Sequence, residues 1–212
     1  RQNSRSRDLT WHLKAGYTPN STDEYSVSYI QEIGAKDAPF AVTDPAASQK
    51  DWTWPYWDIS SLYFLSNTAL GNSAYVKTRV YYNTFTNGLF SYDDPSFTKQ
   101  TKPKSFDSYY ADFAYGGNIE AGDEIFAGDT LKASFLYRRD SHDEWETIFS
   151  PAFTEPHQYT VEDTYSLAAE NSWHATSTID LVGGISYDWR HLLKAQDYID
   201  PSGPTPGTFI NY

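Results

Sequence analysis

The feature that most constrains this chain is a strict alternation of apolar and polar residues that returns in segment after segment. Successive side chains of a β-strand point to opposite faces of the sheet, so such a segment forms a strand with one apolar face and one polar face. In the first segment the apolar residues are Leu9, Trp11, Leu13, Ala15 and Tyr17, and the residues between them are Thr10, His12, Lys14 and Gly16. The chain is therefore expected to belong to the all-β class.

Alternation of the same kind predicts further strands along the chain. Besides residues 9–17, the alternating segments are 25–29, 74–82, 109–120, 131–138, 164–170 and 178–188. Residues 57–65 also have the composition of a strand, but their apolar residues fall on both faces, so the facing of this segment stays open. We therefore predict about eight strands, and residues 208–212 are expected to begin a ninth.

The connections between these segments alternate between short and long. Short turns are predicted near 18–23, 67–72, 122–129 and 172–177, and long loops near 34–55, 84–108, 140–159 and 191–207. Short turns at one end of a sheet and long loops at the other are typical of outer-membrane barrels, whose extracellular loops are the long ones. We therefore predict a single domain, residues 1–212, that is an antiparallel up-and-down transmembrane β-barrel segment.

Composition excludes several other classes of protein. The unbroken apolar runs are only a few residues long, whereas a transmembrane helix needs about 20. A net charge of -12 repels phosphate backbones, so no nucleic-acid partner is predicted. The absence of cysteine removes disulfide frameworks, thiolate metal sites and cysteine nucleophiles.

The polar residues of the predicted strands carry almost all of the strand charge. In a membrane barrel the apolar face meets lipid and the polar face meets the lumen, whereas an ordinary soluble barrel has the reverse arrangement. The aromatic residues favour the membrane arrangement, because Tyr and Trp gather near both ends of the predicted strands, as they do at membrane interfaces. The residues predicted to face the lumen are Lys14, Lys77, Arg79, Asp112, Lys132, Arg138, Glu170 and Asp180.

Motifs for catalysis and for metal binding are absent from the sequence. The five histidines lack the short paired spacing of zinc sites. The segment Gly71-Asn72-Ser73-Ala74-Tyr75 lacks the second glycine of a serine-hydrolase elbow and precedes a predicted strand rather than a helix. No catalytic residue, no cofactor and no metal site is predicted, and the chain is not expected to be an enzyme.

Aromatic residues in the predicted long loops are the candidates for ligand binding. Rings of this kind either stack on a ligand or pack against one another to order a long loop, and both interpretations stay open. The candidate residues are Trp52, Trp54, Phe90, Tyr92, Trp145 and Phe149.

Several strand-and-turn segments resemble those of a known family. Residues 13–20 (LKAGYTPN), 76–82 (VKTRVYY), 130–133 with 137–140 (TLKA, YRRD) and 184–188 (GISYD) resemble successive strands and periplasmic turns of TonB-dependent outer-membrane receptors of the siderophore-receptor type. The resemblance covers roughly residues 8–198. It implies a barrel of about 22 strands in the outer membrane of a Gram-negative bacterium, in contact with lipid and lipopolysaccharide. It also implies a plug domain, uptake of a ferric siderophore or a similar small ligand, and energy supplied by the inner-membrane TonB complex.

The chain departs from that family in lacking a TonB box, a plug and a closing strand with a terminal aromatic residue. It is therefore expected to be a wall segment of a larger receptor. One alternative is a complete eight-stranded outer-membrane barrel that acts as an adhesin or structural anchor. A second alternative is a soluble β-sandwich that binds carbohydrate through its aromatic residues.

Overall fold

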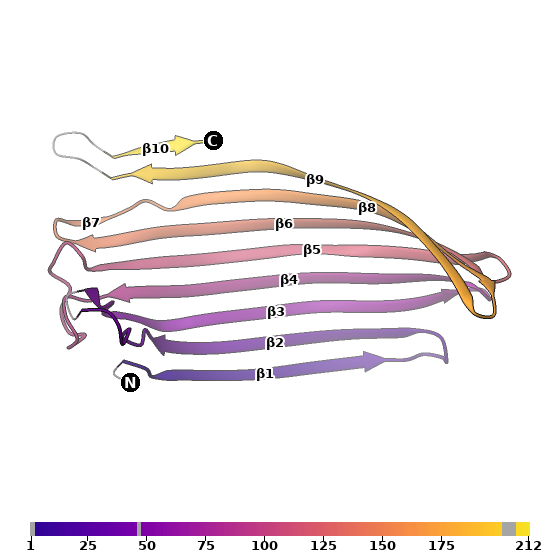
Figure 1. Cartoon of the computed structure of the whole chain (residues 1–212), viewed down its shortest axis with the longest axis horizontal. Coiled ribbons are helices and arrows are strands. Elements are labelled where there is room, and N and C mark those ends of the chain that lie inside the picture. The colour runs from indigo at the N-terminus through magenta and orange to yellow at the C-terminus, as the bar shows by residue number, and fades with distance from the viewer. Residues whose placement is uncertain (1–2, 46–47, 201–206) are drawn as a thin grey trace.

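The computed structural model describes residues 3–45, 48–200 and 207–212, and in this part of the chain the strands form one antiparallel sheet. Its order follows the sequence, β1-β2-β3-β4-β5-β6-β8-β9-β10, and the short β7 pairs with β6 (Figure 1). The strands are β1 (Ser6–Tyr17), β2 (Glu24–Asp37), β3 (Trp52–Leu70), β4 (Ala74–Ser91), β5 (Phe106–Phe126), β6 (Asp129–Phe149), β7 (Ala152–Thr154), β8 (Gln158–Thr176), β9 (Ile179–Ile199) and β10 (Thr208–Asn211).

The all-β prediction of an up-and-down antiparallel sheet is confirmed. The eight predicted segments are the eight long strands, and the predicted ninth strand is β10. Strand β7 was not predicted, because its three residues between Pro151 and Pro156 are too few to show a period.

The long strands run well beyond the segments that alternation predicted. The ranges predicted as loops, 34–55, 84–108, 140–159 and 191–207, each begin with the end of one strand, and the first three also end with the start of the next. In β6, for example, pairing with β5 and β8 continues through residues 140–144, where both faces carry polar side chains. Alternation of polarity stops there because neither face meets an apolar environment, while the hydrogen-bonded ladder goes on.

Two of the short turns depend on glycine. Gly71 follows β3 with φ +80°, and Gly128 precedes β6 with φ +79°. A residue with a Cβ is energetically disfavoured in this left-handed backbone conformation. Glycine adopts it readily and so allows the strands to reverse within two or three residues. The short turns gather at one end of the sheet and the longer connections at the other (Figure 1).

The sheet is a single layer without a hydrophobic core. Among the described residues no hydrophobic side chain is buried, and large ones such as Leu13 (63% exposed), Ile185 (77%) and Tyr187 (67%) lie open. The expectation of a soluble β-sandwich is therefore wrong, since a sandwich buries its apolar face against a second sheet.

The described strands also do not close on themselves. β1 pairs only with β2, and β9 pairs with β8 and β10. The pairing of the first and last long strands that would define a complete eight-stranded barrel is therefore not seen in the part of the chain that the structure covers. The described residues include no helix long and apolar enough to cross a membrane.

Candidate functional site

The register of the sheet fixes which residues share a face. One row of paired residues runs from β1 to β9 through Lys14, Ser28, Tyr63, Tyr81, Gly116, Arg138, Thr164 and Arg190. Because paired residues and every second residue of a strand lie on one side, all eight residues predicted to face a lumen lie together. We call this side the polar face and the side carrying Leu13 and Ile185 the apolar face.

The register also assigns the segment whose facing the sequence left open. Ile59 pairs with Phe85 and Ser61 with Asn83, so Trp57, Ile59 and Ser61 belong to the polar face. The sequence was ambiguous here because Trp57, Ile59 and Leu65 all lie on the polar face. The Trp57 ring packs there against Phe85, with centroids 5.1 Å apart.

Opposite charges are paired on the polar face, both across neighbouring strands and along one strand. Lys132 Nζ lies 2.9 Å from Glu170 Oε1, and Lys77 Nζ lies 3.9 Å from Glu120 Oε1. On β6, Arg138 Nε donates to Asp140 Oδ1 at 2.9 Å. These pairs compensate charge on a surface that is only partly exposed, which is the arrangement expected of a polar channel wall.

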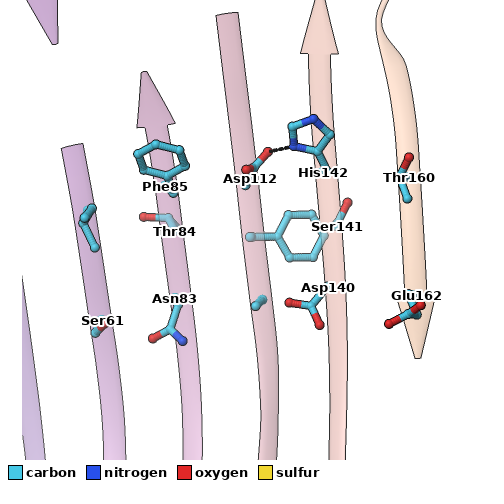
Figure 2. A pocket seen from close by; sticks show the side chains of 13 residues that line it. Ser61, Asn83, Thr84, Phe85, Asp112, Asp140, Ser141, His142, Thr160 and Glu162 are labelled. Carbon is cyan, nitrogen blue, oxygen red and sulfur yellow. Dashed lines mark hydrogen bonds and ion pairs between the residues drawn. The ribbon is translucent and has the colours of Figure 1, made fainter. Parts of the chain in front are cut away.

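A hollow of about 540 Å³ opens on the polar face toward the long-connection end. Five strands line it, with Ile59 and Ser61 from β3, Asn83 and Phe85 from β4, Asp112 from β5, Asp140 and His142 from β6, and Thr160 and Glu162 from β8 (Figure 2). Polar, acidic and aromatic side chains therefore line one hollow. A solute bound there could contact side chains from several strands at once.

His142 is the most connected residue of this hollow. Its Nδ1 lies 2.7 Å from Asp112 Oδ1 (Figure 2), and its Nε2 lies 3.3 Å from Glu144 Oε2. The Tyr110 ring approaches it edge-on, with centroids 4.9 Å apart. Among the described residues, no group of three or more His, Asp and Glu side chains is arranged to hold a metal ion.

Six aromatic residues were expected to lie in long loops, and for five of them this position is wrong. Trp52, Trp54, Phe90, Trp145 and Phe149 belong to strands, and of the six only Tyr92 lies in a connection, where its ring contacts Phe97 at 5.6 Å. They were assigned to loops because polarity no longer alternates where both faces are polar.

The six aromatics also divide between the two faces. Trp52 and Trp54 lie on the polar face with ring centroids 6.3 Å apart, and Lys36 Nζ lies 5.0 Å from the Trp54 ring. Phe90 and Trp145 lie on the apolar face, each in ring contact with Tyr109, at 5.8 and 5.1 Å. Phe149 ends β6, where it pairs with Ala152. Trp52 and Trp54 alone remain together on the side of the hollow.

A belt of aromatic rings crosses the apolar face from β4 to β9. Neighbouring members, with centroids 5.2–6.3 Å apart, are Tyr82, Phe113, Tyr115, Tyr137, Tyr165 and Trp189. Arg139 Nε donates to Asp163 Oδ1 at 2.7 Å. This charged pair also lies on the apolar face, two residues beyond Tyr137 and Tyr165 toward the long-connection end. An apolar band therefore ends at a definite level along the strands.

The connection between β4 and β5 is organised by the carboxylate of Asp93. Asp93 accepts hydrogen bonds from Ser105 Oγ at 2.6 Å and from Thr101 Oγ1 at 2.7 Å, and also from the Thr101 and Lys102 amides. Burial acts to raise the pKa of Asp93, but these donors outweigh it and hold that pKa well below its usual range. The same connection is tied to the start of β3 by Lys104 Nζ, 3.0 Å from Asp51 Oδ2.

Comparison with known proteins identifies the fold. No protein-family model and no curated protein matches the sequence. Among solved structures, the copper transporter OprC is similar, with a TM-score of 0.73 and 16% identity over 99% of this chain. The matched region is 34% of the OprC chain, so this chain spans about a third of that protein's length. At this identity the likeness shows the fold alone, which is a segment of a β-barrel wall.

Proposed function

We propose that the chain is part of the wall of a TonB-dependent outer-membrane transporter, with its apolar face toward lipid and its polar face toward the lumen. The observation that carries this proposal is the separation of the two faces in a sheet that, among its described residues, buries no hydrophobic side chain and leaves many large ones exposed. An apolar surface of this extent marks a membrane or partner interface. Each large aliphatic side chain moved from water into an apolar environment contributes about 1.5–3 kcal/mol, so lipid would stabilise this face strongly.

The height of the apolar band supports a membrane rather than a protein partner. On β8, Tyr165 belongs to the aromatic belt, and Trp173 marks the turn end of the same face. These two residues are separated by about 27 Å along the strand at about 3.4 Å per residue. Strands of outer-membrane barrels tilt by about 35–45°, so this length corresponds to a height of about 19–22 Å, close to the apolar band about 25 Å tall between the two aromatic girdles of such barrels.

The proposed cargo is a scarce ligand such as a ferric siderophore, taken up with energy from the inner-membrane TonB complex through a plug domain. The hollow and the neighbouring Trp52 and Trp54 lie on the polar face toward the long-connection end, which faces the cell exterior in this orientation. Acidic, hydroxyl and aromatic groups there can contact an organic chelate without binding the bare metal. The paired charges nearer the turns, such as Lys77 with Glu120, would face the plug.

Copper is the second candidate, because a similar solved structure is named a copper transporter. Thiolate and thioether ligands select Cu(I), and this chain has no cysteine and no methionine. A Cu(I) site would therefore need ligands from outside these 212 residues, whereas imidazole and carboxylate groups such as His142 and Asp112 suit Cu(II).

The test is uptake in cells that express or lack the protein. We expect the protein in the outer-membrane fraction, and a deletion strain should lose uptake of radiolabelled ferric siderophore under iron limitation. Removal of TonB should give the same loss. Uptake of radiolabelled copper, measured in parallel, distinguishes the second candidate. Recovery of the protein in the soluble fraction, or uptake of both labels unchanged by deletion, would refute the proposal.

A further inference from the structure

On the apolar face, β8 and β9 carry a small apolar hollow below the aromatic belt. It has a volume of about 260 Å³ and is lined on this face by Leu167 and Ala169 of β8 and by Ile185 and Tyr187 of β9. The short side chain of Ala169 leaves room between its larger neighbours. In the proposed orientation the hollow lies within the apolar band, where a hydrocarbon chain of a lipid can fill it and contact its walls.

Charged residues follow the belt on the same two strands. Tyr165 and Trp189 of the belt pair with each other. Two residues further on, Asp163 pairs with His191 of β9 and with Arg139 of β6. Two residues advance a tilted strand by about 5–6 Å in height, and lipid headgroups extend a bilayer by about 5–8 Å on each side of its hydrocarbon. Arg139 and His191 therefore lie at the level of the headgroups.

Asp163 fixes the Arg139 guanidinium and leaves donors on it. Arg139 Nε and Nη2 donate to the two Asp163 carboxylate oxygens at 2.7 and 2.6 Å. The Asp163 side chain is 5% exposed, whereas that of Arg139 is 32% exposed. A guanidinium has five N–H donors, so three of them can reach another acceptor, and the two-point contact with Asp163 fixes their direction. The exposed His191 imidazole adds a further N–H donor beside them.

A β-bulge turns a second cation to the same face. The β8–β9 register shifts by one residue at Val161, which pairs with Lys194 rather than with Leu193. Without the bulge, Leu193 would lie on the apolar face and Lys194 on the polar face. Instead, Lys194 Nζ lies 4.2 Å from the centre of the Tyr159 ring on the apolar face. Lys194 therefore adds positive charge to this face, further from the membrane than Arg139.

Acidic residues leave this strip locally positive. The whole chain has a net charge of -12. On the apolar-face side of β6, β8 and β9 beyond the belt, however, the described carboxylates are only Asp163 and Asp143. Asp163 is bound to Arg139, and Asp143 Oδ1 lies 2.8 Å from His157 Nδ1. The strip therefore complements an anionic partner.

We propose that this strip binds lipopolysaccharide of the outer leaflet, an inference that rests on the transport proposal for the orientation in the membrane. An acyl chain lies in the apolar hollow, a lipid A phosphate meets Arg139 and His191, and acidic groups of the inner-core sugars meet Lys194.

The height of the charged strip selects this lipid over a phospholipid. Val161, the partner of Lys194, lies four residues beyond Tyr165, which is about 10–11 Å in height on a tilted strand. A phospholipid headgroup region of about 5–8 Å does not extend that far. Lipopolysaccharide does, because its acidic sugars stand above the lipid A phosphates.

Binding of rough lipopolysaccharide, which carries lipid A and the inner core alone, tests the proposal. The protein is extracted from outer membranes in a mild detergent. Rough lipopolysaccharide, its deacylated saccharide and phosphatidylglycerol are then titrated separately, with binding measured by native mass spectrometry. We expect lipopolysaccharide to bind most tightly, because it alone offers both acyl chains and two levels of acidic groups.

Variants locate the site without leaving a buried charge unpaired. Lys194→Gln should lower the affinity for lipopolysaccharide about fivefold, the effect of about one basic residue near a lipid surface. Arg139→Gln combined with Asp163→Asn should lower it by a similar factor, because the guanidinium donors to phosphate are lost. Arg190→Gln is the matched control, since Arg190 lies on the polar face of β9 and its loss should not change the affinity.

Heat-modifiable migration in electrophoresis checks that each variant is folded. Affinities equal to that of the unchanged protein in both cation variants, or an equal loss in Arg190→Gln, would overturn the proposal. Phosphatidylglycerol that binds as tightly as lipopolysaccharide would overturn it too, because the strip would then be a general site for anionic lipids. These outcomes leave the transport proposal standing, which instead fails if the protein is recovered in the soluble fraction.

Discussion

Lys132 Nζ lies 2.9 Å from Glu170 Oε1, and the two residues are directly opposite each other in the β6–β8 ladder on the polar face. The two side chains are 35% and 47% exposed, so solvent and salt screening keep the interaction modest. We expect Lys132→Glu to lower the free energy of unfolding slightly, because it places like charges opposite each other.

The reversed pair Lys132→Glu with Glu170→Lys should recover most of that loss. Urea-induced unfolding of the protein refolded in liposomes measures both effects. If the double variant is no more stable than the less stable single variant, the two residues do not interact in the membrane-inserted protein.

The facing of β9 gives a sharper test with neighbouring residues. Ile185 lies on the apolar face and is 77% exposed, while Ser186 lies on the polar face, paired with Ala168. Lysine toward lipid costs about 2–4 kcal/mol near the middle of the bilayer, so Ile185→Lys should strongly reduce stability and the amount of folded protein in the outer membrane.

Ser186→Lys is the matched control, one residue away and with the same added charge. It should leave folding and the amount of protein in the membrane almost unchanged, as judged by heat-modifiable migration in electrophoresis. Equal damage from the two substitutions would contradict the assignment of the faces.

Glycine at the β5–β6 turn is expected to be required for its conformation. Gly128 has φ +79°, so Gly128→Ala should destabilise by about 1–2 kcal/mol through backbone strain. Gly183 of β9 has no positive φ, and a Cβ added there would meet no atom within 4 Å, so Gly183→Ala should change stability by less than about 0.5 kcal/mol. Unfolding midpoints of the two variants compare them directly, and a Gly183→Ala loss as large as that of Gly128→Ala would argue against the turn geometry.

The β4–β5 connection should loosen when Asp93 is removed or protonated. Its pKa is held below the ordinary value of 3.8, so its hydrogen bonds stabilise the loop fully above that value and are lost as the pH falls toward the folded pKa. Asp93→Ala should therefore speed hydrogen exchange at Thr101 and Lys102, whose amides donate to it.

Asp94→Ala serves as the control for Asp93, because Asp94 accepts the Ser96 amide at 2.9 Å and should affect exchange only there. Unchanged exchange at residues 101–105 in the Asp93 variant at neutral pH would show that other contacts order this connection.

Alternation of apolar and polar residues was enough to predict the strands wherever one face of the sheet is apolar and the other polar. It predicted β1, β5 and β9 with the correct residues on each face, because their apolar-face positions in the alternating segments hold only Leu, Ile, Ala, Gly or aromatic residues. It failed beyond Arg139, since both faces of β6 are polar there while the ladder continues. It also could not assign Trp57, whose place on the polar face follows from pairing rather than from its own hydrophobicity.

The hollow was beyond the reach of the sequence for a different reason. His142 and Glu144 lie on one strand and Asp112 on another, about 30 residues away, and only the register brings their side chains together. The sequence shows that these residues are polar, but it does not show which of them are neighbours in space, so their interactions could not be predicted.

The order of the sheet has a consequence for how such a wall can vary. Each long strand is hydrogen-bonded only to the strands nearest to it in sequence, and no hydrophobic side chain of the described residues is buried in a shared core. Stability is then close to a sum of hairpin and neighbour contributions, as in repeat proteins. A hairpin could therefore be gained or lost during evolution while distant strands kept their contacts, and the circumference of the wall could change in steps of two strands.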